Sequence, residues 1–152
     1  MTTLVINSSR SPHGNTRRVA EVIGAVLEAQ VLTPAQVTPD ALRDVQRIGF
    51  GSGIYWMGFD TQLVDLVHRL PDMAGHDAFV FATSGLPEPP FRRYTRTLGH
   101  LLEHKGFRVI GTFTCRGIDT VGPLRLLGGV NKTHPTDGDL AAARTFATQL
   151  TH

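Results

Sequence analysis

Short apolar runs alternate with segments of helical periodicity along this chain. Continuous apolar runs of strand length are each followed by a stretch in which apolar residues recur every three or four positions. Proline and glycine mark the ends of several of these stretches. The predicted strands are residues 4–6, 29–32, 47–52, 78–82 and 109–113, and the predicted helices are residues 19–27, 59–70, 89–105 and 137–150.

Strands that alternate with helices predict an α/β fold with a parallel sheet covered by helices on both faces. At 152 residues the chain fits a single domain, residues 1–152, without a linker or repeat. In such a sheet the ligand lies outside the carboxyl ends of the strands. Three polar or glycine-containing loops follow predicted strands, so we expect residues 8–16, 53–58 and 83–85 to meet at one edge.

The first of these loops has the composition of an anion site. Hydroxyl side chains and a Gly-Asn-Thr sequence lie between an apolar strand and a helix, where backbone N–H groups and the positive helix end can bind a phosphate. The loop lacks the lysine that contacts the β- and γ-phosphates in loops that bind nucleoside triphosphates. A ligand with a single terminal phosphate is therefore favoured. An ordinary turn with a helix cap remains the alternative. The candidate ligands are Ser9, Arg10, Ser11, His13, Gly14, Asn15 and Thr16.

The second and third loops complete a candidate flavin site. Aromatic residues between glycines on a turn favour stacking against a flat ring, although Tyr55 and Trp56 could instead fold back into the core. A phosphate at one end and a stacked ring at the other describe flavin mononucleotide (FMN). The candidate residues of these loops are Gly53, Ile54, Tyr55, Trp56, Met57 and Gly58 in the second, and Thr83, Ser84 and Gly85 in the third.

The chain resembles the flavodoxin family in these three loops and in the order of its elements. The matching segments are residues 11–16, 51–60 and 83–85. The resemblance implies a flavodoxin-like three-layer sandwich with a five-stranded parallel sheet in the order 2-1-3-4-5, bound FMN and electron transfer. The first loop is longer than in flavodoxins, and its Ser-Ser-Arg is similar to NAD(P)H-dependent FMN reductases. Typical flavodoxins are also strongly acidic, whereas this chain has a net charge of +2.

Composition and charge indicate the cellular compartment and the classes of binding partner. The mild positive charge does not predict nucleic acid binding, and no leader or membrane-inserting segment is apparent, so the cytoplasm is expected. The single cysteine, Cys115, agrees with a reducing compartment. Basic residues concentrate between Pro90 and Lys132, which is either a solvated face or a docking surface for an acidic redox partner, a reductase or an electron acceptor. The chain itself is expected to be a monomer or a homodimer.

The sequence therefore predicts an FMN-binding electron carrier of the flavodoxin type. The alternatives are an FMN-dependent NAD(P)H or quinone oxidoreductase, and a binding module that has lost the flavin. No catalytic residue and no metal site are predicted. The His-x-x-Glu-His pattern at residues 100–104 matches a zinc motif but belongs to a sheet-covering helix. The long loop at residues 116–136 is expected to select the electron partner.

Overall fold

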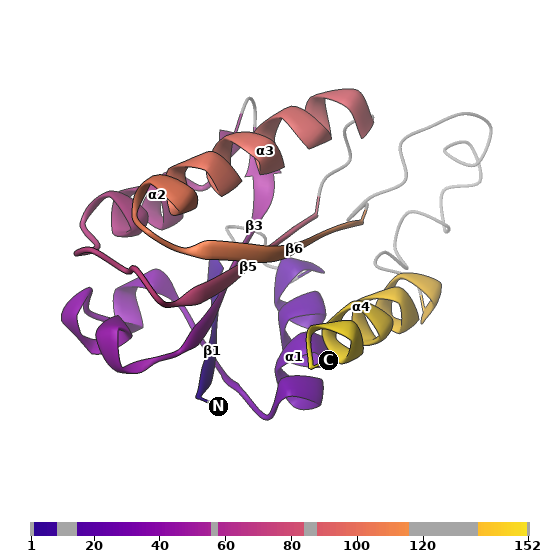
Figure 1. The fold of residues 1–152 in the computed structure, drawn as a ribbon. Coiled ribbons are helices and arrows are strands. Elements are labelled where there is room, and N and C mark those ends of the chain that lie inside the picture. The colour runs from indigo at the N-terminus through magenta and orange to yellow at the C-terminus, as the bar shows by residue number, and fades with distance from the viewer. Residues whose placement is uncertain (1, 9–14, 56–57, 84–87, 116–136, 152) are drawn as a thin grey trace.

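A twisted parallel sheet forms the centre of the computed structural model, which describes residues 2–8, 15–55, 58–83, 88–115 and 137–151 (Figure 1). Five strands follow one another across the sheet in the order β2-β1-β3-β5-β6, and each pairs with its neighbour in parallel. This order confirms the expected 2-1-3-4-5 arrangement. The strands are β1 (Thr3–Ser8), β2 (Gln30–Leu32), β3 (Arg47–Tyr55), β5 (Asp77–Thr83) and β6 (Arg108–Cys115).

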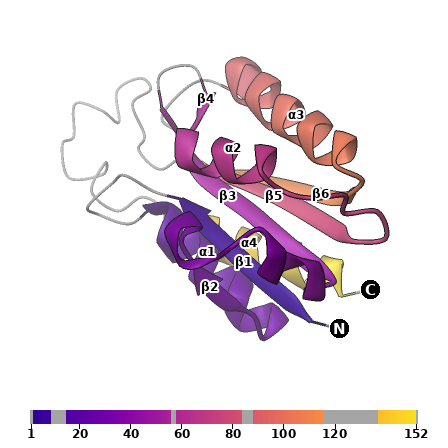
Figure 2. The same cartoon turned by 90° about the vertical axis from the view of Figure 1, so that its left-hand side faces the viewer.

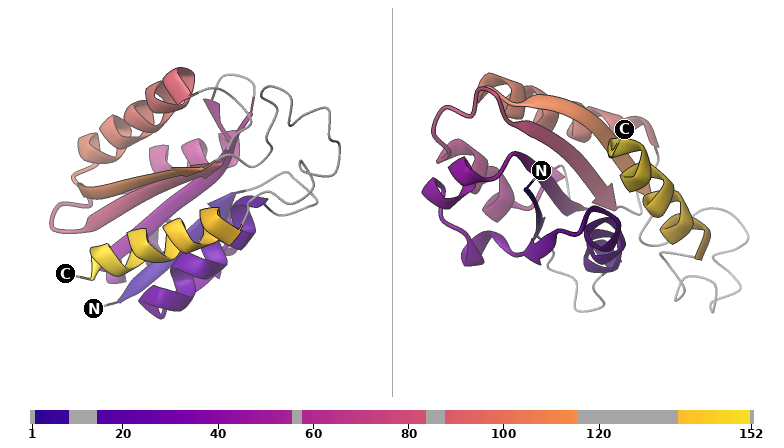
Figure 3. Two further views of the ribbon diagram at one scale, coloured as in Figure 1. Left: turned by 90° about the vertical axis from the view of Figure 1, so that its right-hand side faces the viewer. Right: turned by 60° about the horizontal axis from the view of Figure 1, so that its bottom comes forward.

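Helices cover both faces of this sheet, as the alternating pattern predicts. The helices α1 (Asn15–Leu27) and α4 (Asp137–Leu150) lie side by side on one face, while α2 (Thr61–His68) and α3 (Glu88–His104) cover the other (Figures 2 and 3). The connection after β2 contains two short 3₁₀ helices, Pro34–Gln36 and Asp40–Asp44.

Alternate residues of each strand supply the two hydrophobic cores. In β1, Leu4 and Ile6 pack with α2 and α3, whereas Val5 packs with α1 and α4. Residues 78–83 of β5 are all buried, because this strand lies between β3 and β6 and has helices on both faces. Burial of one large apolar side chain contributes about 1.5–3 kcal/mol to the free energy of folding. Exposing several such side chains on the wrong face would cost several times this amount, so the apolar pattern of a strand decides which face each residue occupies.

The glycines of β3 make room for two phenylalanines of β5. A Cβ atom on Gly49 would overlap the ring of Phe79, and one on Gly51 would overlap the ring of Phe81. Both rings are fully buried on the α1 and α4 face. The first two glycines of the Gly-x-Gly-x-Gly run in this strand, which imitates a dinucleotide fingerprint, therefore serve packing inside the sheet.

The segment after β3 differs from the open turn that we expected. β3 continues to Tyr55, and a short strand, β4 (Gly58–Phe59), pairs antiparallel with it through Ile54 and Tyr55. The backbones of Ile54 and Tyr55 are thus paired with those of Phe59 and Gly58 in a hairpin. Helix α2 consequently begins at Thr61, two residues later than predicted, because Phe59 belongs to the hairpin and Asp60 caps the helix.

Candidate functional site

The carboxyl ends of β1, β3 and β5 lie next to one another, as three parallel strands in register require (Figure 2). Ser8 at the end of β1 is opposite Ser52 of β3, and Gly53 of β3 is opposite Thr83 at the end of β5. Helix α1 begins at Asn15, a short distance along the chain from β1, so the positive end of its dipole belongs to this edge. The edge thus brings together the strand ends from which all three predicted loops depart.

Two hydroxyl groups join the first turn of α1 to the end of β5. The Oγ1 atoms of Thr16 and Thr83 are 2.6 Å apart, and both residues are buried. Each hydroxyl carries one hydrogen, and the bond between them uses only one of the two. The second hydrogen has no acceptor in the described part of the chain, so the pair can donate to a further oxygen, such as that of a phosphate, beside the start of α1.

Asn7 leaves a second hydrogen-bonding group unused near this edge. Its side chain is 5% exposed, and its Oδ1 atom has no hydrogen-bond partner among the residues that the structure describes. Asn7 precedes the last residue of β1 and lies on the same face as Val5, which is the face that α1 covers. A buried acceptor without a donor is rare in folded proteins. It suits a ligand that carries hydroxyl groups.

A buried carboxylate ties the other face of this edge together. Asp60 accepts a hydrogen bond of 2.7 Å from the Ser8 hydroxyl, and its backbone N–H donates to Ser52 Oγ over 3.0 Å. Ser52 in turn donates to the carbonyl oxygen of Gly53. The second oxygen of Asp60 accepts from the N–H of Gln62, 3.2 Å away, which caps α2. These contacts, which we call the Asp60 network, fix the ends of β1 and β3 to the start of α2.

The structure describes only part of the predicted site. It places the backbone of residues 15, 54, 55 and 58 and the whole of Thr16, Gly53 and Thr83, and it brings the last three to one edge. Ser9, Arg10, Ser11, His13, Gly14, Trp56, Met57, Ser84 and Gly85 lie outside the described residues. The same applies to Cys115 as a side chain and to the loop 116–136.

Sequence reasoning missed the structural role of Ser8 and Ser52. Asp60 caps α2 and is also the centre of a network that the sequence pattern does not predict. The sequence does contain a signal for the structural role of these two serines, because each is a hydroxyl residue within or directly after an otherwise apolar strand. Their meeting depends on the register of β1 against β3, which the sequence does not display.

Two of the basic residues between Pro90 and Lys132, the segment expected to be either a solvated face or a docking surface, have partners within the fold. Lys105 donates to the carbonyl oxygens of His68 and Leu70 at the end of α2, and Arg108 forms an ion pair with Asp77. Arg96 is exposed on α3. Across the described residues there is no group of three or more histidine, cysteine, aspartate or glutamate side chains able to hold a metal ion. No helix within the same residues is long and apolar enough to cross a membrane.

Comparisons with known proteins agree with this fold. A family model described as a flavodoxin domain matches residues 4–114. An uncharacterized protein of Methanocaldococcus jannaschii is 34% identical over 140 residues, which are 91% of each chain. Among solved structures, oxidised flavodoxin 2 from Bacillus cereus superimposes with a TM-score of 0.74 and 17% identity, covering 99% of this chain and 98% of that one. The Trp repressor binding protein from Bacillus subtilis gives a TM-score of 0.70 at 20% identity, covering 95% and 97%.

Proposed function

The chain belongs to the flavodoxin domain family, and from this premise we propose that it binds FMN at the carboxyl edge of the sheet and transfers electrons between redox partners. The observation that carries the proposal is the buried Thr16–Thr83 hydroxyl pair, which has a hydrogen that no described residue accepts, beside the start of α1. When bound, FMN accepts and releases electrons one or two at a time.

The residues present suit the parts of this cofactor. Thr16 and the N-terminal end of α1 would hold the phosphate, together with Ser9, Arg10, Ser11, His13, Gly14 and Asn15 of the first loop. Asn7 can accept a hydrogen bond from a ribityl hydroxyl, since its Oδ1 atom has no donor among the described residues. Thr83, whose hydroxyl is 2.6 Å from that of Thr16, would lie beside the phosphate as well. The remaining proposed ligands, which would contact the ring and its edge, are Gly53, Ile54, Tyr55, Trp56, Met57, Gly58, Ser84 and Gly85.

The proposed unit is one domain formed by residues 1–152. The family model ends at residue 114, but α4 lies beyond that point and completes the fold. Ala143 and Ala147 of α4 are buried in the same core as Val5 and Phe79 of the sheet. We propose that this domain works in the cytoplasm, exchanging electrons with a separate redox protein that has an acidic surface.

Replacing Thr16 with valine tests the proposed phosphate contact. Valine keeps the shape of threonine but removes the hydroxyl, so we expect the affinity for FMN to fall by about tenfold or more, the usual effect of losing a hydrogen bond to a charged group. Riboflavin lacks the phosphate, and its affinity should be the same for both proteins. Fluorescence quenching titrations measure all four dissociation constants.

Two variants, one at Thr16 itself and one at a distant threonine, are the controls for this experiment. Thr16→Ser retains the hydroxyl and should keep most of the FMN affinity. Thr145→Val makes the same change on the exposed surface of α4, where the hydroxyl donates to the carbonyl of Ala141, and should leave FMN binding unchanged. If the wild-type chain takes up no FMN, the proposed function is wrong. If Thr16→Val weakens FMN and riboflavin equally, the assignment of the phosphate to Thr16 is wrong.

Mixing the FMN-loaded protein with NADH or NADPH distinguishes a carrier from a reductase. A carrier depends on a separate electron donor, so we expect the flavin absorbance to change slowly or not at all under anaerobic conditions until a reductase is added. Rapid bleaching by either nicotinamide alone would instead assign the chain to the NAD(P)H-dependent oxidoreductases.

A further inference from the structure

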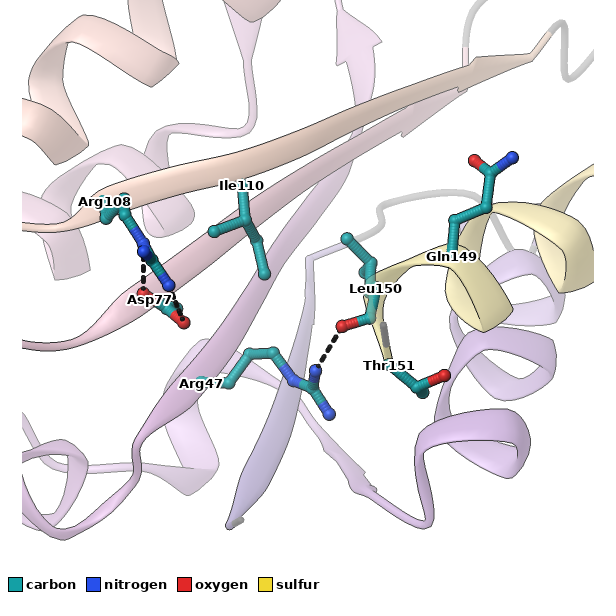
Figure 4. Close-up of a pocket in the computed structure, with 7 residues that line it drawn as sticks. All are labelled: Arg47, Asp77, Arg108, Ile110, Gln149, Leu150 and Thr151. Carbon is teal, nitrogen blue, oxygen red and sulfur yellow. Dashed lines mark hydrogen bonds and ion pairs between the residues drawn. The ribbon is translucent and has the colours of Figure 1, made fainter.

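The amino edge of the sheet, opposite the candidate cofactor site, carries a row of polar residues. Thr3, Arg47, Asp77 and Arg108 are the first residues of β1, β3, β5 and β6, and each is in register with the next. Residues in register on neighbouring strands share a face, and the end of α4 lies against this row (Figure 4). This row and the proposed FMN site lie at opposite ends of the strands, so a ligand at one edge does not require a ligand at the other.

Arg47 carries a buried positive charge that no carboxylate of the described residues contacts. Its side chain donates from Nε to Thr3 Oγ1 over 3.1 Å and from Nη1 to the carbonyl oxygen of Leu150 over 2.8 Å. Arg47 is only 8% exposed, and in the described part of the chain its Nη2 group has no partner. Buried charges in proteins are ordinarily paired, because their removal from water is costly. Within the part of the chain that the structure describes, Arg47 therefore lacks a counter-ion.

The neighbouring carboxylate is already engaged by another arginine. Asp77 accepts two hydrogen bonds of 3.0 Å, one from Nε and one from Nη2 of Arg108. This bond and the attraction of the two charges raise the pKa of Arg108 above its ordinary value, so the guanidinium stays charged. The two arginines and one aspartate together have one unit of positive charge in excess. The carbonyl end of α4 offsets part of it through Leu150.

A pocket opens in front of Arg47. Its volume is about 420 Å³, within the range of small-molecule sites in proteins. Ile110 and Leu150 form apolar walls, while Gln149 and Thr151 add polar groups from the last turn of α4 and the residue after it (Figure 4). The pocket thus combines one unmatched cation with an apolar surface of limited size.

We propose that this pocket binds the monoanion of a small organic acid. The carboxylate would take the free donors of Arg47, and the short apolar part of the acid would lie between Ile110 and Leu150. A singly charged ligand matches the single excess charge. Asp77 and the negative end of α4 both oppose a dianion such as phosphate.

Methyl NMR of the purified protein, with any FMN it holds left in place, tests this proposal. The probe is sodium butyrate, titrated against sodium chloride at equal ionic strength, while the methyl signals of Ile110 and Leu150 are followed. We expect saturable shifts of both signals with butyrate and none with chloride. Because only this edge is observed, an anion that binds to the opposite edge of the sheet does not interfere.

A charge change at the rim provides the matched variant. Gln149 is exposed, so Gln149→Glu adds a negative charge beside the pocket without altering the core, and we expect it to weaken butyrate binding by about fivefold or more. Gln62→Glu makes the same change on the exposed surface of α2, on the other face of the sheet, and should bind butyrate like the wild type.

Three results would overturn the proposal. The first is the absence of saturable shifts at Ile110 and Leu150. The second is equal binding by Gln149→Glu and the wild type. The third is tighter binding of inorganic phosphate than of butyrate at these methyl signals, which would exclude a monocarboxylate as the preferred ligand class.

Discussion

Replacing Asp60 with alanine is expected to lower the free energy of unfolding by about 3 kcal/mol, because the change removes both a helix cap and a buried charge-assisted hydrogen bond. Asp60 is 3% exposed and accepts from the Ser8 hydroxyl and the Gln62 N–H. Alanine leaves the buried Ser8 hydroxyl and the partly buried Gln62 N–H without this acceptor. Urea denaturation of the cofactor-free protein measures the loss, independently of whether FMN binds.

The same substitution is also expected to weaken FMN binding by about tenfold or more. The Asp60 network holds the ends of β1 and β3 together, and two of the three proposed FMN loops leave from these ends. Loosening their relative position costs affinity although Asp60 is not a proposed FMN ligand. A titration of FMN into Asp60→Ala under conditions where the variant remains folded measures this effect.

Two further substitutions serve as controls for the stability loss expected of Asp60→Ala. Asp60→Asn keeps a helix-capping side chain of the same shape, and the hydroxyl of Ser8 can rotate to accept from the new amide, so we expect a loss of only about 1 kcal/mol. Asp40→Ala removes an exposed aspartate from the first turn of a 3₁₀ helix and should change stability by less than about 0.5 kcal/mol. Equal losses in Asp60→Ala and Asp40→Ala would contradict a role for the network.

Gly51→Ala is the second substitution with a large expected effect, a loss of about 3 kcal/mol in the free energy of unfolding. The new Cβ would overlap the ring of Phe81, which is fully buried, so the ring or the strand backbone must shift. Phe81 also packs at a tilted angle against Phe79, with ring centroids 6.4 Å apart. The strain therefore extends to a second aromatic ring, and thermal or urea unfolding should register it.

A double substitution and a matched glycine identify the cause. Phe81→Leu removes the overlapping ring atoms, so the double variant Gly51→Ala/Phe81→Leu should lose less stability than the sum of the two single variants. A Cβ on Gly99 of α3 meets no atom within 4 Å. Gly99→Ala should therefore stabilise the protein by about 0.5–1 kcal/mol, as alanine does inside a helix. Additive losses at Gly51 and Phe81 would show that the two residues do not interact.

The fold was predictable because the apolar pattern within each segment agrees with the place of that segment in the helix–sheet–helix layers. The continuous apolar run of β5 indicated a strand buried on both faces, and the structure confirms it. The last helix occupies the predicted range, residues 137–150. The helix before β6 ends as predicted near Gly106, which has a φ of +106° and whose Cβ would lie 2.6 Å from the Ala74 nitrogen.

The hairpin of β3 and β4 was not predictable from the sequence, for a physical reason. Its residues are mostly apolar or glycine and lack the alternation that marks a half-buried strand. Only the antiparallel pairing of Ile54 with Phe59 and of Tyr55 with Gly58 defines it. The proposed contacts of this hairpin with the flavin ring remain predictions.

The sequence by itself determined the strands of the parallel sheet and the helices that cover it, their order, and the meeting of the strand ends at one edge, because parallel strands must all end on the same side. Only the tertiary structure decided which side chains touch at the two edges of the sheet. Ser8 and Asp60 are 52 positions apart, Thr16 and Thr83 are 67 apart, and Arg47 and Leu150 are 103 apart. Such contacts depend on strand register and on how each helix lies against the sheet, and periodicity within a single segment carries no information about either.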